Sequence, residues 1–381
     1  MLVNVGLAFF SAGLALAAVE WVLRTGPLAL QVRPYRLRLQ DPNLWDEPYL
    51  QVADDIPYTT RPDYVGRWAS GGRITINHQG FRTDAAGAAR SYARIDILCL
   101  GDSFTFGYLV DDADTYPGRL GRLYESSGQT VVNAGYYGGF SFDSAGLRYR
   151  RTLAPWHPRV VIYGVFPGND LDDLAVWTRT SPGGGPAQLR TKNQIVDAAG
   201  YSVPLARESR LFVGLSQAWS RWRLRDELAE TDERRWARAS DAIHRLRETT
   251  DRAGTRLVFV FLREPNGQFA QEIARRRQVP AADFLAGLEA QTRRLQDVLD
   301  AEHVEWHDDE SVLAALRAAL GRRHLPPLPG SLSSLRADLE ARAEAGGWQP
   351  RLLAGPDEIH YSPLTNAYVA SWVYAQLQHS P

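Results

Sequence analysis

The chain has 381 residues, of which 44% are hydrophobic and 23% charged, so it can bury a full hydrophobic core. A formal net charge of -1 gives no general attraction to nucleic acid, and nucleic acid is not expected as a partner. The single cysteine, Cys99, excludes an intramolecular disulfide, and the single lysine, Lys192, leaves almost no candidate for Schiff-base chemistry. One domain with insertions is the simplest interpretation.

The N-terminal segment is strongly apolar. From Leu2 to Trp21 the only charged residue is Glu20, and as a helix this stretch would span about 30 Å, the thickness of a bilayer core. We interpret residues 1–23 as a transmembrane anchor, with a cleaved signal peptide and a buried core helix as the alternatives. Arginines follow the segment and no Lys or Arg precedes it, which favours a cytoplasmic main domain by the positive-inside rule.

Strand and helix patterns then alternate along the chain. Residues 24–93 are predicted to be a lead-in segment packed on the core, with a short exposed strand at 73–77. The run from Ile95 to Leu100 predicts a buried strand that ends at Gly101. Further strands are expected at 130–134, 159–165, 256–262 and 303–306, and helical patterns near 116–123, 236–246, 285–299 and 368–377. This alternation predicts a mostly parallel sheet covered on both faces.

Two stretches break the alternation and are interpreted as insertions, near 171–250 and 322–350. The first includes Leu211 to Leu224, which carries Trp219 and Trp222 beside several arginines. A helix packed on the domain is the favoured interpretation there. An amphipathic lid or a membrane-surface helix is the alternative.

A serine follows the first buried strand almost at once. Ser103 is expected at the C-terminal end of that strand, where open α/β sheets place their ligands. Nucleophilic catalysis by serine needs a base, a group that orients the base, and donors for an oxyanion. His360, with Asp357 three residues earlier in a loop before the C-terminal helix, can supply the first two. Each pattern taken alone also fits an ordinary turn or helix cap.

Candidate oxyanion donors follow the next two strands. The glycine-rich stretch 133–139 closes the second strand, where a backbone N–H can approach a bound oxygen without obstruction by a Cβ atom. Gly168-Asn169-Asp170 follows the third strand and offers a side-chain amide. Because the carboxyl ends of parallel strands meet at one edge, we expect both loops to lie near Ser103.

Four blocks of the sequence, taken in order, resemble the SGNH (GDSL) hydrolase superfamily. They are Gly101-Asp102-Ser103, a glycine after the second strand, Gly168-Asn169-Asp170 and Asp357-x-x-His360. The resemblance covers 94–381 and implies a flavodoxin-like three-layer α/β/α fold with a five-stranded parallel sheet. It also implies a Ser103 nucleophile, a His360 base and Asp357 as its partner. The implied oxyanion hole consists of Ser103, Gly138 and Asn169, with Gly135 or Gly139 as alternatives to Gly138. No cofactor or metal is implied.

The resemblance predicts an esterase that cleaves an acyl ester of a small molecule or polysaccharide. Acetyl is the favoured acyl group. A polysaccharide O-acyltransferase and a non-catalytic carbohydrate-binding or assembly protein are the alternatives. Asn77-x-x-Gly80-Phe81-Arg82 resembles membrane-anchored bacterial members, which favours an extracytoplasmic catalytic domain. This placement conflicts with the positive-inside rule, so the orientation stays open. A metal site at His303 and His307 is disfavoured, because on a strand they lie about 13 Å apart.

Overall fold

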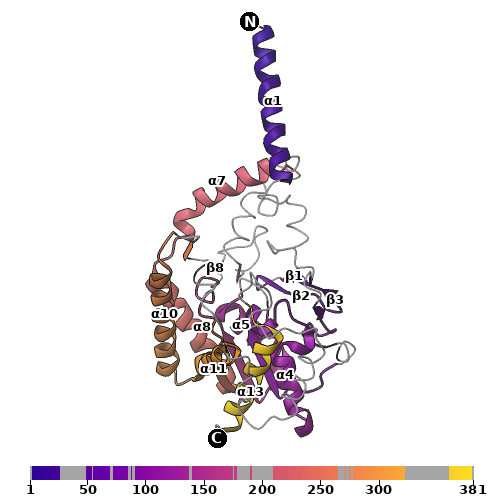
Figure 1. Cartoon of the computed structure of the whole chain (residues 1–381), viewed down its shortest axis with the longest axis vertical. Helices are drawn as coiled ribbons and strands as arrows, with labels where there is room; N and C mark the ends of the chain where they lie inside the picture. Colours follow the sequence, from indigo (N-terminus) through magenta and orange to yellow (C-terminus); the bar gives the residue numbers. More distant parts are fainter. Residues whose placement is uncertain are drawn as a thin grey trace. The chain divides into compact units, whose positions relative to one another are not determined.

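The computed structural model describes residues 2–25, 49–53, 55–68, 72–84, 87, 91–136, 140–174, 176–177, 189–190, 209–264, 271, 274–275, 278–321 and 360–379. The chain divides into two compact units (Figure 1). The first unit contains Met1–Thr59 and Val176–Asp232, and the second contains Thr60–Ala175 and Glu233–Pro381.

A five-stranded parallel sheet forms the centre of the second unit, with the strand order β11-β10-β7-β5-β6. Every residue of β5 is buried, because helices cover both faces of the sheet and leave no polar side for alternation. The predicted five-stranded parallel α/β sheet is thus confirmed. The strands are β5 (Ile97–Gly101), β6 (Val131–Asn133), β7 (Val160–Val165), β10 (Arg256–Phe261) and β11 (Glu305–Asp308).

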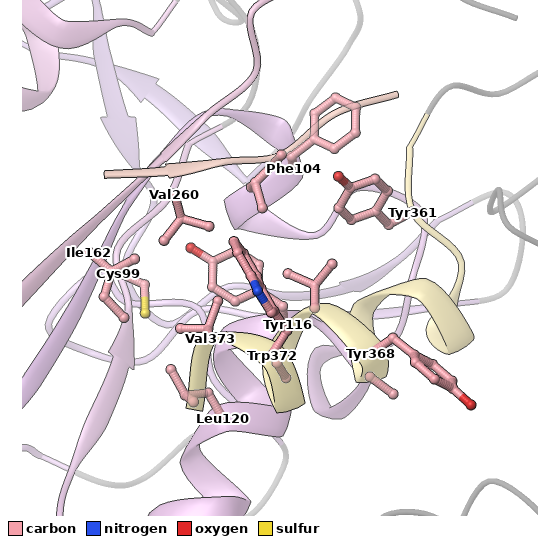
Figure 2. Packing of buried hydrophobic residues seen from close by; sticks show 14 of the residues in the cluster. Cys99, Phe104, Tyr116, Leu120, Ile162, Val260, Tyr361, Tyr368, Trp372 and Val373 are labelled. Carbon is pink, nitrogen blue, oxygen red and sulfur yellow. The ribbon is translucent and has the colours of Figure 1, made fainter. Parts of the chain in front are cut away.

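One face of the sheet packs against α4 (Tyr116–Tyr124), α11 (Glu310–Gly321) and α13 (Pro363–His379). Figure 2 shows Cys99 and Ile162 of neighbouring strands beside Val373 of α13. These side chains share a face because residues paired in register point the same way.

The opposite face of the sheet is covered by α5 (Phe142–Arg148), whose first residue packs on two strands. The Phe142 ring centroid lies 5.3 Å from that of Tyr163 and 6.3 Å from that of Phe259. α8 (Asp232–Arg252) buries its predicted apolar stripe, including Ile243, whereas α10 (Ala281–Ala301) buries Leu295 and Leu299 of its stripe but leaves Leu285 exposed. Short helical segments are α3 (Ser103–Phe106), η1 (Asp112–Asp114), η2 (Glu125–Ser127), η3 (Tyr149–Leu153) and η4 (Ala154–Trp156).

Two strand predictions need correction. The fifth strand begins at Glu305, two residues after the predicted start at His303. The reason is that His303 adopts a left-handed φ of 53°, which closes the end of α10. The strand expected at 73–77 is present as β4 (Arg73–Thr75), but it is not exposed. Its polar positions are buried because protein groups satisfy them: the Thr75 N–H donates to Asp112, and the Asn77 side chain accepts the Phe81 N–H.

The remaining strands are short. β4 pairs antiparallel with β3 (Val65–Arg67) in the second unit. β1 (Leu50–Val52) pairs with β2 (Tyr58–Thr60), and β8 (Val176–Trp177) pairs antiparallel with β9 (Leu189–Arg190). The predicted insertion at 322–350 lies outside the described residues.

Two helices dominate the first unit, α1 (Leu2–Thr25) and α7 (Arg210–Leu228). The helix expected over Leu211 to Leu224 is therefore present. Within the described part of the chain, no helix combines the length and apolarity that crossing a bilayer requires. The predicted transmembrane anchor is not confirmed, and the orientation of the chain stays a prediction.

Candidate active site

Ser103 is presented by a sharp turn at the end of β5. Gly101 has a φ of 140°, and a Cβ atom there would lie 2.5 Å from the backbone oxygen of Gly164 on the neighbouring strand, so only glycine fits. The Asp102 carboxylate then accepts the Phe104 N–H at 3.0 Å and caps α3. Ser103 is the first residue of this short helix and is 5% exposed.

The structure brings His360 to Ser103 from the far end of the chain. His360 Nε2 lies 2.8 Å from Ser103 Oγ, although 257 positions separate the two residues. With Nε2 unprotonated, the hydroxyl donates to the imidazole, which is the arrangement that general-base activation of a serine requires. The His360 ring is 8% exposed and packs on Phe104 and Tyr108, with centroid distances of 5.0 and 4.8 Å.

The residue after His360 fixes the position of the imidazole. The Tyr361 hydroxyl lies 2.7 Å from both the Arg263 carbonyl and the Asp309 carboxyl, at the ends of β10 and β11. Burial raises the pKa of Asp309 well above its usual range, which favours a neutral carboxyl in this position. The Asn366 side chain donates to the Tyr361 carbonyl at 3.1 Å. His360 is thus held by the sheet and by α13 together.

Asn169 lies in the turn after β7, at the same edge of the sheet. Its Nδ2 donates to Asp173 at 2.8 Å, so one of its two N–H bonds is occupied. Its Oδ1 is buried and has no hydrogen-bond partner within the described residues. The Asn169 amide also interacts with the Asp102 carboxyl, and its predicted role as an oxyanion donor stays a prediction.

Two predicted site residues, Gly138 and Asp357, lie outside the described residues, as does the alternative donor Gly139. The other alternative, Gly135, is described. Its N–H donates to the Asn133 side chain at 3.0 Å, so this N–H is not free to bind an oxyanion. A Cβ atom on Gly135 would lie 2.6 Å from the Phe106 nitrogen, so glycine is needed there for close packing on α3.

Arg82 is a site residue whose role sequence reasoning missed. Arg82 lies in the Asn77-x-x-Gly80-Phe81-Arg82 motif, and this motif was the only sequence feature that could have pointed to its role. Its buried guanidinium uses all five N–H donors. Nε donates to Asp112 at 2.9 Å, Nη1 to the carbonyls of Phe106 (2.6 Å) and Gly107, and Nη2 to those of Val110 (2.7 Å) and Arg73 (3.1 Å). Arg82 therefore holds the C-terminal end of the helix that begins with Ser103.

Buried carboxyl groups lie behind Ser103. Burial, aided by the charge of Asp173, raises the pKa of Asp102 to about 7, although the Phe104 N–H and the Asn169 amide oppose the shift. Burial, followed by the nearby Asp102 charge, raises the pKa of Asp170 well above its usual range. Ionisation of either carboxyl group therefore destabilises the folded protein.

This burial predicts a pH-dependent stability. Because the folded-state pKa of Asp102 is raised, its contribution to stability is present in acid and is lost as the pH rises from about 4 through about 7. Asp102→Asn keeps an acceptor for the Phe104 N–H but cannot ionise. We expect the variant to gain on the order of 2–4 kcal/mol relative to wild type between pH 5 and pH 8. Urea unfolding at both pH values measures this difference, and parallel pH dependences in the two proteins would contradict the assignment.

The other titratable candidates do not form a second site. His307 Nε2 lies 2.8 Å from Glu305, and His303 lies in the turn before the strand. Among the described residues, no group of three or more His, Cys, Asp or Glu side chains is arranged to hold a metal ion. Burial raises the pKa of the Cys99 thiol far above its usual range, so this thiol does not act as a nucleophile.

Comparison with known proteins gives matches among solved structures. A proposed lipolytic protein of the G-D-S-L family from Desulfitobacterium hafniense DCB-2 matches with 12% identity and a TM-score of 0.35, covering 74% of this chain and 98% of that one. The lipase/acylhydrolase from Enterococcus faecalis matches with 12% identity and a TM-score of 0.35, over 74% and 96%. The acetyl xylan esterase AlAXEase matches with 11% identity and a TM-score of 0.34, over 74% and 100%.

These matches include the G-D-S-L family that the four sequence blocks resemble. No family model matches the chain, and no curated protein matches its sequence. At TM-scores this low, only the geometry of this chain's own residues bears on its chemistry.

Proposed function

We propose that this protein is a serine hydrolase of the SGNH (GDSL) type that cleaves an acyl ester. The observation that supports this proposal is the 2.8 Å contact between His360 Nε2 and Ser103 Oγ at the carboxyl edge of the sheet. Both side chains are nearly buried, and their supports come from separate elements, Asp102 for the serine and Tyr361 for the imidazole.

In the proposed reaction, Ser103 Oγ attacks the ester carbonyl carbon while His360 Nε2 accepts the hydroxyl proton. The tetrahedral intermediate collapses, the ester C–O bond breaks, and the imidazolium returns the proton to the departing alcohol. Water then attacks the acyl-enzyme by the same route. We assign the oxyanion to the N–H groups of Ser103, Gly138 and Asn169, and the orientation of His360 to Asp357, on the strength of the sequence blocks.

The substrate proposed from the same resemblance is an acetyl ester on a small molecule or a polysaccharide. A carbohydrate O-acyltransferase uses the same first half-reaction and differs in the acceptor, a sugar hydroxyl in place of water. Supplying an acetyl donor with and without a sugar acceptor separates the two. If acyl transfer to the sugar exceeds acid release, the enzyme is a transferase.

Covalent labelling tests the proposed function directly. A fluorophosphonate phosphonylates an activated serine with loss of fluoride, so we expect one adduct on the folded protein, located by mass spectrometry on the peptide that contains Ser103. Heat-unfolded protein provides the control and should stay unlabelled, because the serine then lacks its base. Glycan binding by folded protein that resists labelling would point instead to the non-catalytic alternative.

A further inference from the structure

Helix α7 exposes an apolar surface that a soluble protein normally buries. At about 100° per residue, its buried residues Val213, Ser220 and Leu224 lie along one side of the helix. Leu215, Trp219 and Trp222 lie along the opposite side and are 62%, 50% and 62% exposed. Their spacing of four and three residues makes a continuous row, which we call the apolar ridge. Exposed apolar rows of this kind mark interaction surfaces.

Arginines flank the apolar ridge on both sides. Arg223 falls on one side of it, and Arg221 and Arg225 fall on the other, all three exposed. The guanidinium carbons of Arg223 and Arg225 lie 5.1 and 5.9 Å from the ring centroids of Trp219 and Trp222. The sequence from Ser209 to Arg225 contains no acidic residue. Asp226 and Glu227 follow in the last turn of α7, so the charge is positive up to Arg225 and mixed beyond it.

The start of α7 is fixed to the end of α1 in the same unit (Figure 1). The Glu20 carboxylate accepts the N–H groups of Arg210 at 2.9 Å and Leu211 at 2.8 Å, and the Ser209 hydroxyl at 3.0 Å. Although burial opposes the shift, these bonds lower the pKa of Glu20 to about 2, so the carboxylate stays ionised at neutral pH. The junction therefore persists across the physiological pH range.

The surface of α1 near this junction is also apolar. Trp21 is 66% exposed and Val22 50%, and Phe10, further along the helix, is 65% exposed. The apolar ridge of α7 thus belongs to a unit whose other long helix exposes side chains of the same kind.

We propose that α7 is a peripheral membrane-binding helix whose apolar ridge enters an anionic lipid surface. Tryptophan and leucine on one side with arginine on the flanks is the composition of helices that lie in the membrane interface. The flanking arginines meet the lipid phosphates, which is why the partner is an anionic bilayer rather than a neutral surface. This inference does not depend on the proposed hydrolase activity.

A label on α7 separates docking of this helix from any membrane contact by α1. Ala218 is exposed beside the ridge, and Ala218→Cys in the full chain provides one reactive thiol, because Cys99 is fully buried. An environment-sensitive fluorophore on residue 218 should shift to the blue with vesicles of mixed phosphatidylcholine and phosphatidylglycerol. The shift should weaken with phosphatidylcholine alone and at high salt.

Two variants test the two parts of the surface. Arg221→Gln/Arg223→Gln/Arg225→Gln should require at least roughly tenfold more anionic lipid for the same shift, since each arginine near the surface contributes to binding. Trp219→Ser/Trp222→Ser should weaken binding to both kinds of vesicle. Leu285→Ser/Arg293→Gln is the matched control, because it removes an exposed apolar side chain and an exposed arginine from α10, and should change nothing.

Two outcomes would overturn the proposal. A label that stays in water while the protein sediments with the vesicles means that α7 does not dock. A blue shift without lipid that grows with protein concentration means that a second copy of the chain covers the ridge.

Discussion

Replacing Ser103 by alanine is expected to lower kcat for hydrolysis of p-nitrophenyl acetate by roughly 10⁴-fold, because the nucleophile that forms the acyl-enzyme is gone. His360→Ala should cost nearly as much, since the hydroxyl then has no base at 2.8 Å. The double variant should be no worse than either single one, because the two groups act as a unit. Initial rates of nitrophenol release measure all three.

The control for these variants is Ser127→Ala, which removes an exposed serine hydroxyl and should keep full activity. Thermal unfolding of each variant shows whether a lost rate reflects lost folding, and we expect little change for Ser103→Ala. Hydrolysis by Ser103→Ala at the wild-type rate would remove this residue from the mechanism.

Replacing Arg82 by alanine is expected to lower the free energy of unfolding by about 3–5 kcal/mol. The side chains of Arg82 and Asp112 are 1% and 3% exposed, so the change leaves a buried carboxylate without its cation. Burial already raises the pKa of Asp112, and the Arg82 charge is the largest of the interactions that oppose that shift. Four backbone carbonyls also lose a donor. Urea unfolding followed by circular dichroism measures the loss.

Lysine variants separate folding from positioning of the nucleophile. Arg82→Lys keeps the charge but cannot reach five acceptors from one ammonium group, so α3 should shift and kcat should fall with KM unchanged. Arg119→Lys is the matched control, because Arg119 is equally buried and pairs with Asp114 at 2.6 Å. It should lose stability and keep its kcat. Equal kcat values in the two lysine variants would show that Arg82 acts on stability alone.

The strands and the turn that carries Ser103 were predictable because their signals are local. Runs such as Val160–Val165 are apolar throughout, as buried parallel strands must be, and glycine at 101 marks the turn that carries the serine. The pairing of His360 with Ser103 required the resemblance of four blocks in order, since no spacing rule joins residues 257 positions apart.

The features that sequence missed depend on contacts between distant segments. The alternation around Ile74 predicted an exposed strand, but the polar positions are satisfied by Asp112 and by the local turn. In the sequence alone, Arg82 has the properties of an ordinary surface charge. The fold buries it by bringing five acceptors around its guanidinium. Gly138 and Asp357 lie outside the described residues, so their roles stay predictions.

The long separation between nucleophile and base also governs when activity can begin. At typical synthesis rates, Ser103 leaves the ribosome roughly 10 to 50 s before His360, so a growing chain carries an inert hydroxyl for most of its translation. Truncated products and nascent chains should therefore be unable to attack esters around them. On the proposed mechanism, Ser103 becomes reactive only after α13 has docked and placed His360 beside it.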